Sequence, residues 1–303
     1  MPESLTFCGR TFGSRELDLM RRLAREFSGL GVTEIARTVC ELLEWTRPSG
    51  GLKNHECRQL LERLQAEGFL QLPEMRKLGG RGPRRVDVSG ACPEPALLAC
   101  AVGDCEPLAL ALVEGPAESR RWREQMERHH YLGCRVPFGA NLRYWVRTQD
   151  REVACLLWTS PAWKMQAREE WIGWSDEQRR GNLQRIVNNG RFLILPWVRV
   201  KGLASKILAL SARHVPRDWE SHYGYRPLLL EHWWTPAAFA GPATEPPTGC
   251  MSGEPPDAAA WTASTKLTVL LSKTSTSIRW SATSVSNYAV ISRGKQIQPA
   301  IVI

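Results

Sequence analysis

The sequence predicts an α+β protein in which an N-terminal helical unit precedes a mixed-sheet α/β core. Apolar residues recur at helical spacing through residues 15–73, which favours a compact group of helices. From residue 105 onward, strand-like apolar runs alternate with amphipathic helical stretches, as in helices packed around one mixed sheet. Residues 242–303 differ from both parts, because they are rich in Ser, Thr and Pro and show little periodicity. A length of 303 residues is in accord with two domains.

The composition favours an anionic partner and a cytoplasmic location. The formal net charge is +9 and the pI is about 9.3, and nucleic acid is the commonest partner of such basic chains. No apolar run reaches the roughly 18 residues that a membrane span needs, and the N-terminus lacks the apolar core of a signal peptide. None of the nine cysteines forms a Cys-x-x-Cys pair, so we expect reduced thiols, no disulfide framework and no metal site.

Residues 1–75 are expected to form a winged-helix-like unit. The stretch "RELDLMRRLAREF" opens the unit with one apolar helix face. Thr33 and Asn54 are residue types that cap helices, and each precedes a further stretch of helical periodicity. The stretch "FLQLP" at residues 69–73 predicts a short strand. Three helices and a strand are the order of a winged helix, and the alternative is a generic helical bundle that does not enter a DNA groove.

Residues 76–104 are expected to be a basic arm and linker. The segment "RKLGGRGPRR" concentrates positive charge where Gly and Pro disfavour regular structure. Because such an arm neutralises DNA phosphates, we predict DNA binding here, and the alternative is a solvated linker between domains. The residues expected to bind nucleic acid are Arg76, Lys77, Arg81, Arg84 and Arg85.

Residues 105–241 are expected to contain the α/β core. Strands are predicted at "PLALALVEG", "LRYWVRT" and "REVACLLWTS", the last two as an antiparallel pair around Gln149-Asp150. A helix is predicted over "AESRRWREQMERHH", after Pro116. The stretch "KMQAREEWIGWSDEQRRGNLQRIVNN" is helical in tendency, with a break at residues 172–174 and a cap at Ser175. The strand "RFLILPWVRV", the helix "LASKILALSARHV" and the strand "RPLLLEHWW" complete the core.

The turn after "RFLILPWVRV" is the main candidate for a ligand site. Its pattern, Arg-x-x-Gly-x-Ala, resembles the phosphate-binding turn of GCN5-related acetyltransferases (the GNAT fold), and the order of elements around it resembles that fold as well. The resemblance implies an acyltransferase that uses an acyl-CoA donor, with coenzyme A held by backbone amides at a helix N-terminus. The alternatives are a tight strand–helix junction and a site for a nucleic-acid phosphate. The cofactor-binding candidates are Arg199, Val200, Lys201, Gly202, Leu203, Ala204 and Ser205.

Other polar and aromatic residues are candidates for roles in a site. His130, at the end of a predicted helix, is a candidate general base, and the alternative is a cap on the helix C-terminus. Asn188 and Asn189 are candidates for orienting a substrate or for forming a turn. Trp171 and Trp174 share a helix face, where core packing is the alternative to base stacking.

Several stretches of the chain together resemble the Druantia anti-phage protein A (DruA) family, over roughly residues 15–241. They are "HHYLG" (129–133), "GANLRYWV" (139–146), "REEWIGW" (168–174), "VNNGRFLILPWVRVKGLAS" (187–205) and "YGYRPLLLE" (223–231). The resemblance implies a role in bacterial anti-phage defence, alongside other Druantia components, and supplies no biochemical activity. A DNA-binding accessory protein of a mobile element is the alternative.

The resemblance stops abruptly at Gly241. The family pattern continues Thr-Cys-Tyr-Arg-Ala-Ala-Asn-Trp, whereas this chain reads "PATEPPTG". The degenerate codons of residues 241–249, read from the third base of the glycine codon, can encode the family residues in order. The loss of one base near Gly241 therefore predicts that residues 242–303 are an out-of-frame tail, disordered or only locally structured, and that the activity of this product is compromised. The alternative is a genuine lineage-specific tail.

Overall fold

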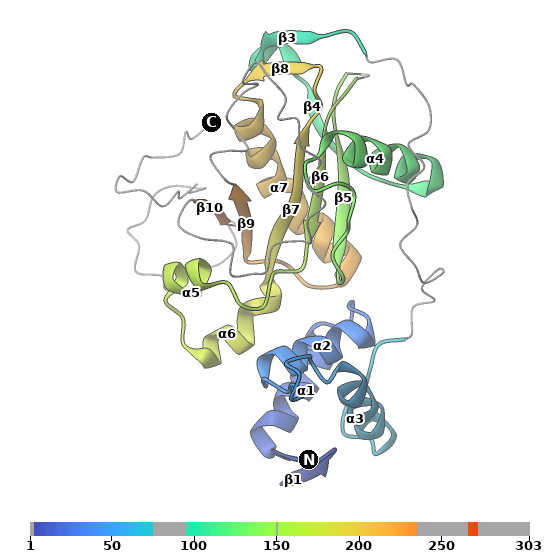
Figure 1. Ribbon diagram of the computed structural model, residues 1–303, viewed down its shortest axis with the longest axis vertical. Helices are drawn as coiled ribbons and strands as arrows, with labels where there is room; N and C mark the ends of the chain where they lie inside the picture. The colour runs from blue at the N-terminus through green and yellow to red at the C-terminus, as the bar shows by residue number, and fades with distance from the viewer. Residues whose placement is uncertain (1–2, 75–94, 150, 235–265, 272–303) are drawn as a thin grey trace.

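The computed structural model describes residues 3–74, 95–149, 151–234 and 266–271 of an α+β protein (Figure 1). The central sheet consists of β4 (Leu108–Leu112), β5 (Asn141–Thr148), β6 (Arg151–Thr159), β7 (Ile186–Ile194), β9 (Leu229–Trp234) and β10 (Lys266–Leu271). Their spatial order is β10-β9-β7-β6-β5-β4, so β9 lies next to β7 although a helix separates them in sequence. Within these ranges, no helix is long and apolar enough to cross a membrane.

The N-terminal unit combines a β-hairpin with three helices. The hairpin strands are β1 (Ser4–Phe7) and β2 (Arg10–Gly13), and the helices are α1 (Ser14–Glu26), α2 (Val32–Leu42) and α3 (Asn54–Ala66). The sequence predicts all three helices, because their apolar positions form continuous buried faces. It does not predict the hairpin, whose strands are only four residues long.

Three local expectations for this unit are wrong. The N-caps of α2 and α3 are Gly31 and Lys53, so Thr33 and Asn54 lie inside the helices and cap nothing. The expected strand at residues 69–73 is absent. The Leu72 N–H donates to the Gln65 side chain at 2.7 Å, so this segment follows the end of α3 and joins no ladder. The strand that a winged helix requires after its third helix is therefore missing from the described residues.

The central sheet is mixed. β4, β5, β6 and β7 are successively antiparallel, β9 is parallel to β7, and β10 is antiparallel to β9. The predicted β5–β6 hairpin is confirmed, with Thr148 opposite Arg151. Nearly every side chain of β6 is buried, because helices cover both faces of the sheet.

The predicted strand over residues 191–200 is two strands, and the first begins earlier than expected. β7 starts at Ile186, although the sequence favours a helix there, because Ile186 and Val187 pair with β9 and the ladder to β6 begins at Asn188. It ends before Pro196, which has no N–H to donate to a ladder. β8 (Val198–Lys201) then pairs in parallel with β3 (Leu98–Ala101) in a separate small sheet. The end of the expected linker is thus part of the fold, as is the 3-10 turn at Val102–Cys105.

Two long helices cover opposite faces of the sheet. α4 (Gly115–His129) packs where Arg143 donates to Ser119 at 3.0 Å. α7 (Leu203–Tyr223) packs against the other face, where the hydroxyl of Tyr144, the next residue of β5, donates to Asp218 at 2.9 Å. Consecutive residues of a strand point to opposite faces, so these two bonds place α4 and α7 on different sides of β5. Figure 1 shows the two helices flanking the sheet.

The helical stretch before β7 breaks where the sequence predicts. α5 (Gln166–Ile172) ends at Gly173, whose φ of +67° is a conformation that glycine adopts without strain. The N-cap of α6 (Asp176–Asn182) is Ser175, whose hydroxyl accepts from the Gln178 N–H at 3.2 Å. The Gln178 side chain returns the bond to the Ser175 N–H at 2.8 Å, which completes a capping box. A 3-10 turn, Leu183–Arg185, leads into β7.

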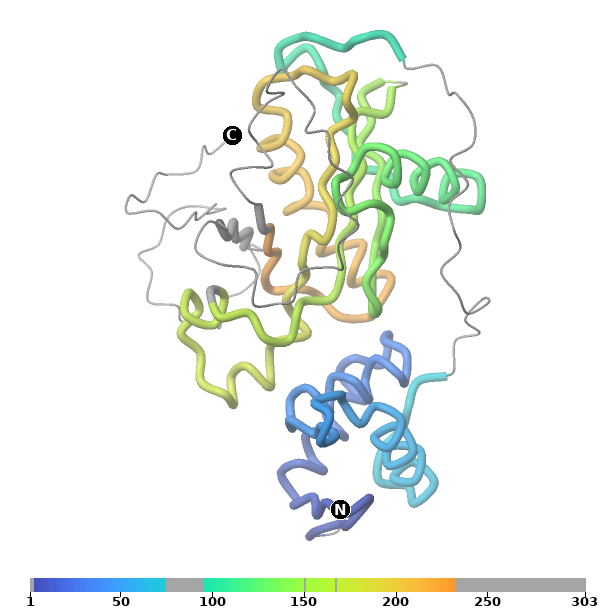
Figure 2. The backbone as a smooth tube through the Cα atoms, in the orientation of Figure 1, coloured from blue at the N-terminus to red at the C-terminus, as the bar shows by residue number. Residues whose placement is uncertain are grey.

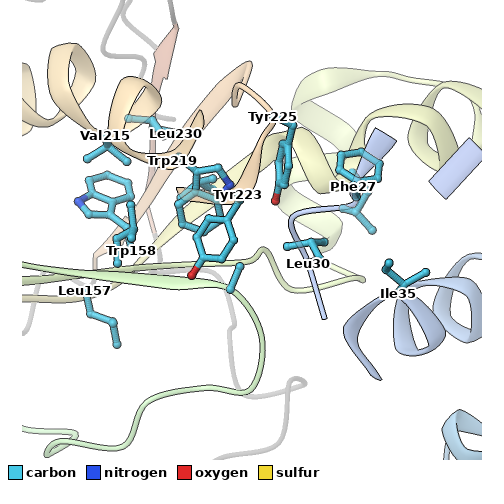
Figure 3. Packing of buried hydrophobic residues seen from close by; sticks show 14 of the residues in the cluster. Phe27, Leu30, Ile35, Leu157, Trp158, Val215, Trp219, Tyr223, Tyr225 and Leu230 are labelled. Carbon is cyan, nitrogen blue, oxygen red and sulfur yellow. The ribbon is translucent and has the colours of Figure 1, made fainter. Parts of the chain in front are cut away.

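The N-terminal unit packs against the end of the sheet where β7 and β9 begin, as the tube in Figure 2 shows. The rings of Phe27 and Tyr225 meet edge to face, with centroids 4.8 Å apart, and Figure 3 shows Leu30 beside them. The Glu34 carboxylate accepts from the Ala140 N–H at 2.8 Å and from the Ser160 hydroxyl at 2.6 Å. Both parts therefore contribute to one continuous hydrophobic core.

Candidate functional site

The parallel ladder between β7 and β9 ends at a pair of polar residues. Ladder pairing runs from Ile186 opposite Leu229 to Asn189 opposite His232. Beyond that point β7 continues to Ile194 and pairs only with β6, after a bulge at Gly190. Two parallel strands are thus held together at their starts and unpaired with each other further on. Bulges of this kind redirect side chains and end pairing, and they are common beside functional sites.

Asn189 determines which nitrogen of His232 carries the proton. The Asn189 amide donates to the Leu157 carbonyl at 3.4 Å, which leaves its oxygen to face His232 Nδ1 at 3.0 Å. Because an amide oxygen only accepts, Nδ1 carries the hydrogen and Nε2 carries the lone pair. Burial lowers the pKa of His232 to about 4, so the ring is neutral near pH 7. His232 thus offers a hydrogen-bond acceptor at the end of the ladder.

The adjacent residue, Glu231, belongs to a buried ion pair. Glu231 and Arg168 have fully buried side chains, and their closest atoms are 3.4 Å apart. The Arg168 guanidinium also donates to the Ala162 carbonyl at 2.7 Å. Removing one partner of such a pair leaves an uncompensated buried charge, which is why buried pairs are strongly destabilised by single substitutions. The pair ties α5 to β9 beside the polar end of the ladder.

The "REEWIGW" stretch forms the rest of this network. Glu169 accepts from Arg168 at 3.0 Å and from the Trp174 indole N–H, and it lies 3.7 Å from Arg179. Arg179 in turn donates to the Trp163 carbonyl at 2.7 Å. One carboxylate therefore holds α5, the Gly173 break and α6 together.

The candidate turn lies at the start of α7. Gly202 is the N-cap of α7, with φ +83°, and a Cβ added there would meet nothing within 4 Å. Arg199 and Lys201 are exposed, and Lys206 is engaged in an ion pair with Glu106 at 2.6 Å. The candidate residues divide between β8 (Arg199, Val200 and Lys201), the N-cap (Gly202) and the first turn of α7 (Leu203, Ala204 and Ser205).

His130 ends α4, and its ring is engaged locally. Its Nδ1 accepts from the Leu132 N–H at 3.1 Å, so the hydrogen of the neutral ring is on Nε2. Burial, together with the nearby Arg191, lowers the pKa of His130 to about 4. Among the described residues, no hydrogen bond joins His130 to the turn or to His232, so the structure does not bring these candidates together.

The other candidates have different outcomes. The five basic residues of the arm, Arg76 to Arg85, lie outside the described residues. Asn188 faces Glu231 across the parallel ladder, so the asparagines belong to a strand and form no turn. Trp171 and Trp174 pack against a small buried cluster of apolar residues.

Glu231 and His232 are functional candidates that sequence patterns do not single out. The signal present in the sequence is a Glu-His pair inside the otherwise apolar stretch "RPLLLEHWW", because charged residues are seldom fully buried without a partner. Their partners are distant in sequence: Arg168 is 63 residues from Glu231, and Asn189 is 43 residues from His232. Only the fold brings the four together.

The fold and this cluster define a mixed α+β protein with a buried polar group where two parallel strands separate. A family model described as Druantia protein DruA matches residues 95–244, which is about half of the chain and includes the whole cluster. The chain belongs to the DruA family and is a Druantia anti-phage defence component. No curated protein and no solved structure matches it.

Proposed function

We propose that this defence protein binds an acyl-CoA-type donor with its core and transfers the acyl group to an acceptor. The observation that carries the proposal is the β7–β9 pair. The parallel ladder of this pair ends at Asn189–His232. The segment that connects β7 to β9 contains α7, and the turn Arg199–Ser205 lies where α7 starts. This arrangement supplies the two elements that such a donor needs, a place for its phosphates and a place for its reacting end. The Arg-x-x-Gly-x-Ala pattern of the turn, which resembles the phosphate-binding turn of GNAT acetyltransferases, also supports the proposal.

The turn supplies the phosphate position. The first N–H groups of a helix have no partner within the helix, and the dipole of a 21-residue helix favours an anion at its N-terminus. A Cβ added at Gly202 would meet nothing within 4 Å, so there is room for a ligand group beside the turn. Arg199 and Lys201 add exposed positive charge, whereas Lys206 adds little because Glu106 neutralises it. The turn therefore suits a pyrophosphate held mainly by backbone amides.

The end of the ladder supplies the reacting position. A strand rises about 3.3 Å per residue, so β7 alone extends roughly 16 Å from Asn189 to Ile194, before β8 leads to the turn. A donor that reaches both positions must carry an extended arm between its phosphates and its reacting group, as an acyl-CoA does. His232 Nε2 then accepts a hydrogen bond from the N–H or O–H of the acceptor and orients it toward the thioester.

Coenzyme A titration of the full-length protein by calorimetry tests the proposal. Gly202→Glu should abolish binding, because it places bulk and negative charge at the amides. Gly224→Glu is the matched control, since Gly224 ends the same helix with a similar φ of +77° and equally open space. A protein whose reading frame is restored after Gly241 should be titrated in parallel. If neither protein binds coenzyme A, or if both glycine variants bind as the parent does, the turn is only a strand–helix junction.

DNA binding by the N-terminal unit and arm is the second candidate. Its structural support is on α1, where Arg15, Arg22 and Arg25 are exposed and make no ion pair with any described residue. The arginines of α3 differ, because Arg58 and Arg63 each pair with a glutamate four residues later. We therefore place the DNA-facing charge on α1 and on the arm, and not on α3.

The salt dependence of duplex DNA binding tests this candidate. Each neutralised phosphate contributes a slope of about −0.9 to log K against log salt concentration. Replacing Arg81, Arg84 and Arg85 with Ala should weaken binding and make this slope shallower by up to about 3. The double substitution of Arg58 and Arg63 with Ala is the control and should change the slope little. An unchanged affinity in the arm variant would remove the arm from the interface.

A further inference from the structure

A pocket of about 820 Å³ lies between α4 and the β5–β6 hairpin, on the face of the sheet away from α7. Its volume falls in the range of sites for small organic ligands. We propose that this pocket binds a nucleoside phosphate. The proposal is independent of the acyl-CoA site, because the pocket includes no residue of the Arg199–Ser205 turn and neither member of the Asn189–His232 pair.

The charge of the lining favours an anion. Four arginines line the pocket against two glutamates, Glu124 and Glu152, an excess of two positive charges. The arginines are Arg121, Arg128, Arg147 and Arg151. A guanidinium presents up to five N–H donors in a planar fork that matches the oxygens of a phosphate.

The arginines are held in place before a ligand arrives. Glu152 pairs with Arg121 and also lies 3.3 Å from Arg147. Arg147 bonds to Glu118 at 2.6 Å, and Arg151 donates to the Ala96 carbonyl. Each contact uses only part of a guanidinium fork, so N–H groups remain for a phosphate. Fixing these side chains in advance reduces the entropy that binding would otherwise cost.

Aromatic side chains supply the second half of a nucleotide site. Trp145 is fully buried in the lining, with the Arg121 guanidinium 5.6 Å from its ring centroid. Trp197 is only half-buried, and His129 meets it edge-on at 5.6 Å. An accessible indole face stacks with any nucleobase, because every base has a π-face. Arginines for the phosphate and Trp197 for the base therefore share one pocket.

The chain itself connects the pocket to the basic arm. Pro95 lines the pocket and lies within the arm and linker segment 76–104, ten residues after Arg85 in sequence. Because the arm is expected to contact nucleic acid, the nucleoside phosphate has two possible sources. It is either a free nucleotide or the terminal nucleotide of a single strand. The two sources are separated by comparing 5′-phosphorylated mononucleotides with a short single-stranded DNA that carries a 5′-phosphate.

Binding to the full-length protein can be measured by calorimetry for mononucleotides and by fluorescence anisotropy for the oligonucleotide. Arg121→Glu should weaken binding about ten- to hundredfold, since it replaces a charge-assisted donor with a repelling carboxylate. Trp197→Ala should weaken binding to a comparable degree, and Trp197→Phe should retain most of it. Arg120→Glu is the matched control, because Arg120 is an exposed neighbour on the same helix that does not line the pocket.

The outcomes separate this proposal from the others. Loss of mononucleotide binding in Arg121→Glu, with mononucleotide binding unchanged in Gly202→Glu, supports a site distinct from the turn. Oligonucleotide binding without mononucleotide binding would identify a strand end as the ligand. Equal losses in Arg120→Glu and Arg121→Glu would show general surface electrostatics and overturn the proposal. So would the absence of binding to any of these nucleotides at millimolar concentration.

Discussion

A single amide decides the chemistry of His232. Asn189 lies opposite it on the neighbouring strand, and the orientation of that amide places the imidazole lone pair on Nε2. The His232 ring also has an apolar neighbour, because the centroid of the Phe192 ring lies 5.3 Å from that of the imidazole. This burial is what lowers the pKa of His232 to about 4.

The lowered pKa predicts a loss of stability in mild acid. The folded-state pKa of about 4 lies below the ordinary value of 6.5, so the unfolded chain binds more protons between these limits. Stability therefore falls as pH decreases through this window, and His232 accounts for about 2 kcal/mol of the loss by pH 5. Urea titrations at pH 7 and pH 5 give the loss in free energy of unfolding between the two. This loss should be smaller in His232→Gln than in the parent, by about 2 kcal/mol. An equal difference in both proteins would contradict the assignment, and His214→Gln, at an exposed position, is the control.

At the scale of elements, the Arg168–Glu231 pair joins a short helix to β9, the strand next to the outer edge of the sheet. α5 has only seven residues and buries little of its own surface in the main core. Isolated helices of this length are unstable in water, so tertiary contacts must hold α5 in place. The ion pair with β9 and the contacts of Glu169 provide them.

Glu231→Gln should destabilise the protein by about 3 kcal/mol, because it removes the fully buried carboxylate that faces Arg168 and leaves only the partly exposed Glu169 paired with that charge. The double variant Arg168→Met, Glu231→Leu should recover much of this loss, since an apolar pair of similar size avoids the desolvation of both ions. Free energies of unfolding from urea titrations give the comparison. Glu62→Gln, which breaks the exposed pair with Arg58, should cost less than about 1 kcal/mol. A double variant less stable than Glu231→Gln would show that the network has another role.

The elements also show where sequence reasoning succeeds and where it stops. The three N-terminal helices, the β5–β6 hairpin and the break at Gly173 follow local rules of periodicity, turn chemistry and capping, and the sequence predicts them. The first residues of β7 do not follow such local rules, because Ile186 and Val187 become part of a strand only through pairing with β9, which is distant in sequence. The polar cluster fails to emerge for the same reason, as its partners meet through a parallel crossover. The arrangement of such a crossover depends on the whole fold and not on a local pattern.

At the scale of the whole molecule, the N-terminal unit and the core are joined by a tight contact at Gly29. A Cβ built on Gly29 would lie 1.7 Å from the Tyr223 carbonyl oxygen, closer than any side-chain atom can approach. The opposing group is backbone at the end of α7, which cannot move aside cheaply. Glycine is thus required for α1–α2 to dock against the sheet, and Phe27 and Glu34 secure the same interface.

Gly29→Ala should therefore loosen the N-terminal unit from the core. We expect faster cleavage by trypsin between the two parts, and a drop of several degrees in the unfolding temperature. Gly51→Ala is the control, because the nearest atom to its added Cβ would be at an ordinary 3.9 Å. Identical digestion patterns for the two variants would show that the contact does not determine docking.

The strand β10 also determines what the molecule presents to its neighbours. It pairs with β9 along the full six residues from Lys266 to Leu271, and so occupies the outer edge of the central sheet. The sequence "KLTVLL" contains four apolar residues and the β-branched Thr268 and Val269, a composition that favours pairing at an open sheet edge even in an out-of-frame tail. A chain that ended at Gly241 would expose the β9 backbone as a template for strand addition. The visible consequence would be dimers or larger aggregates of folded protein, with an otherwise intact fold.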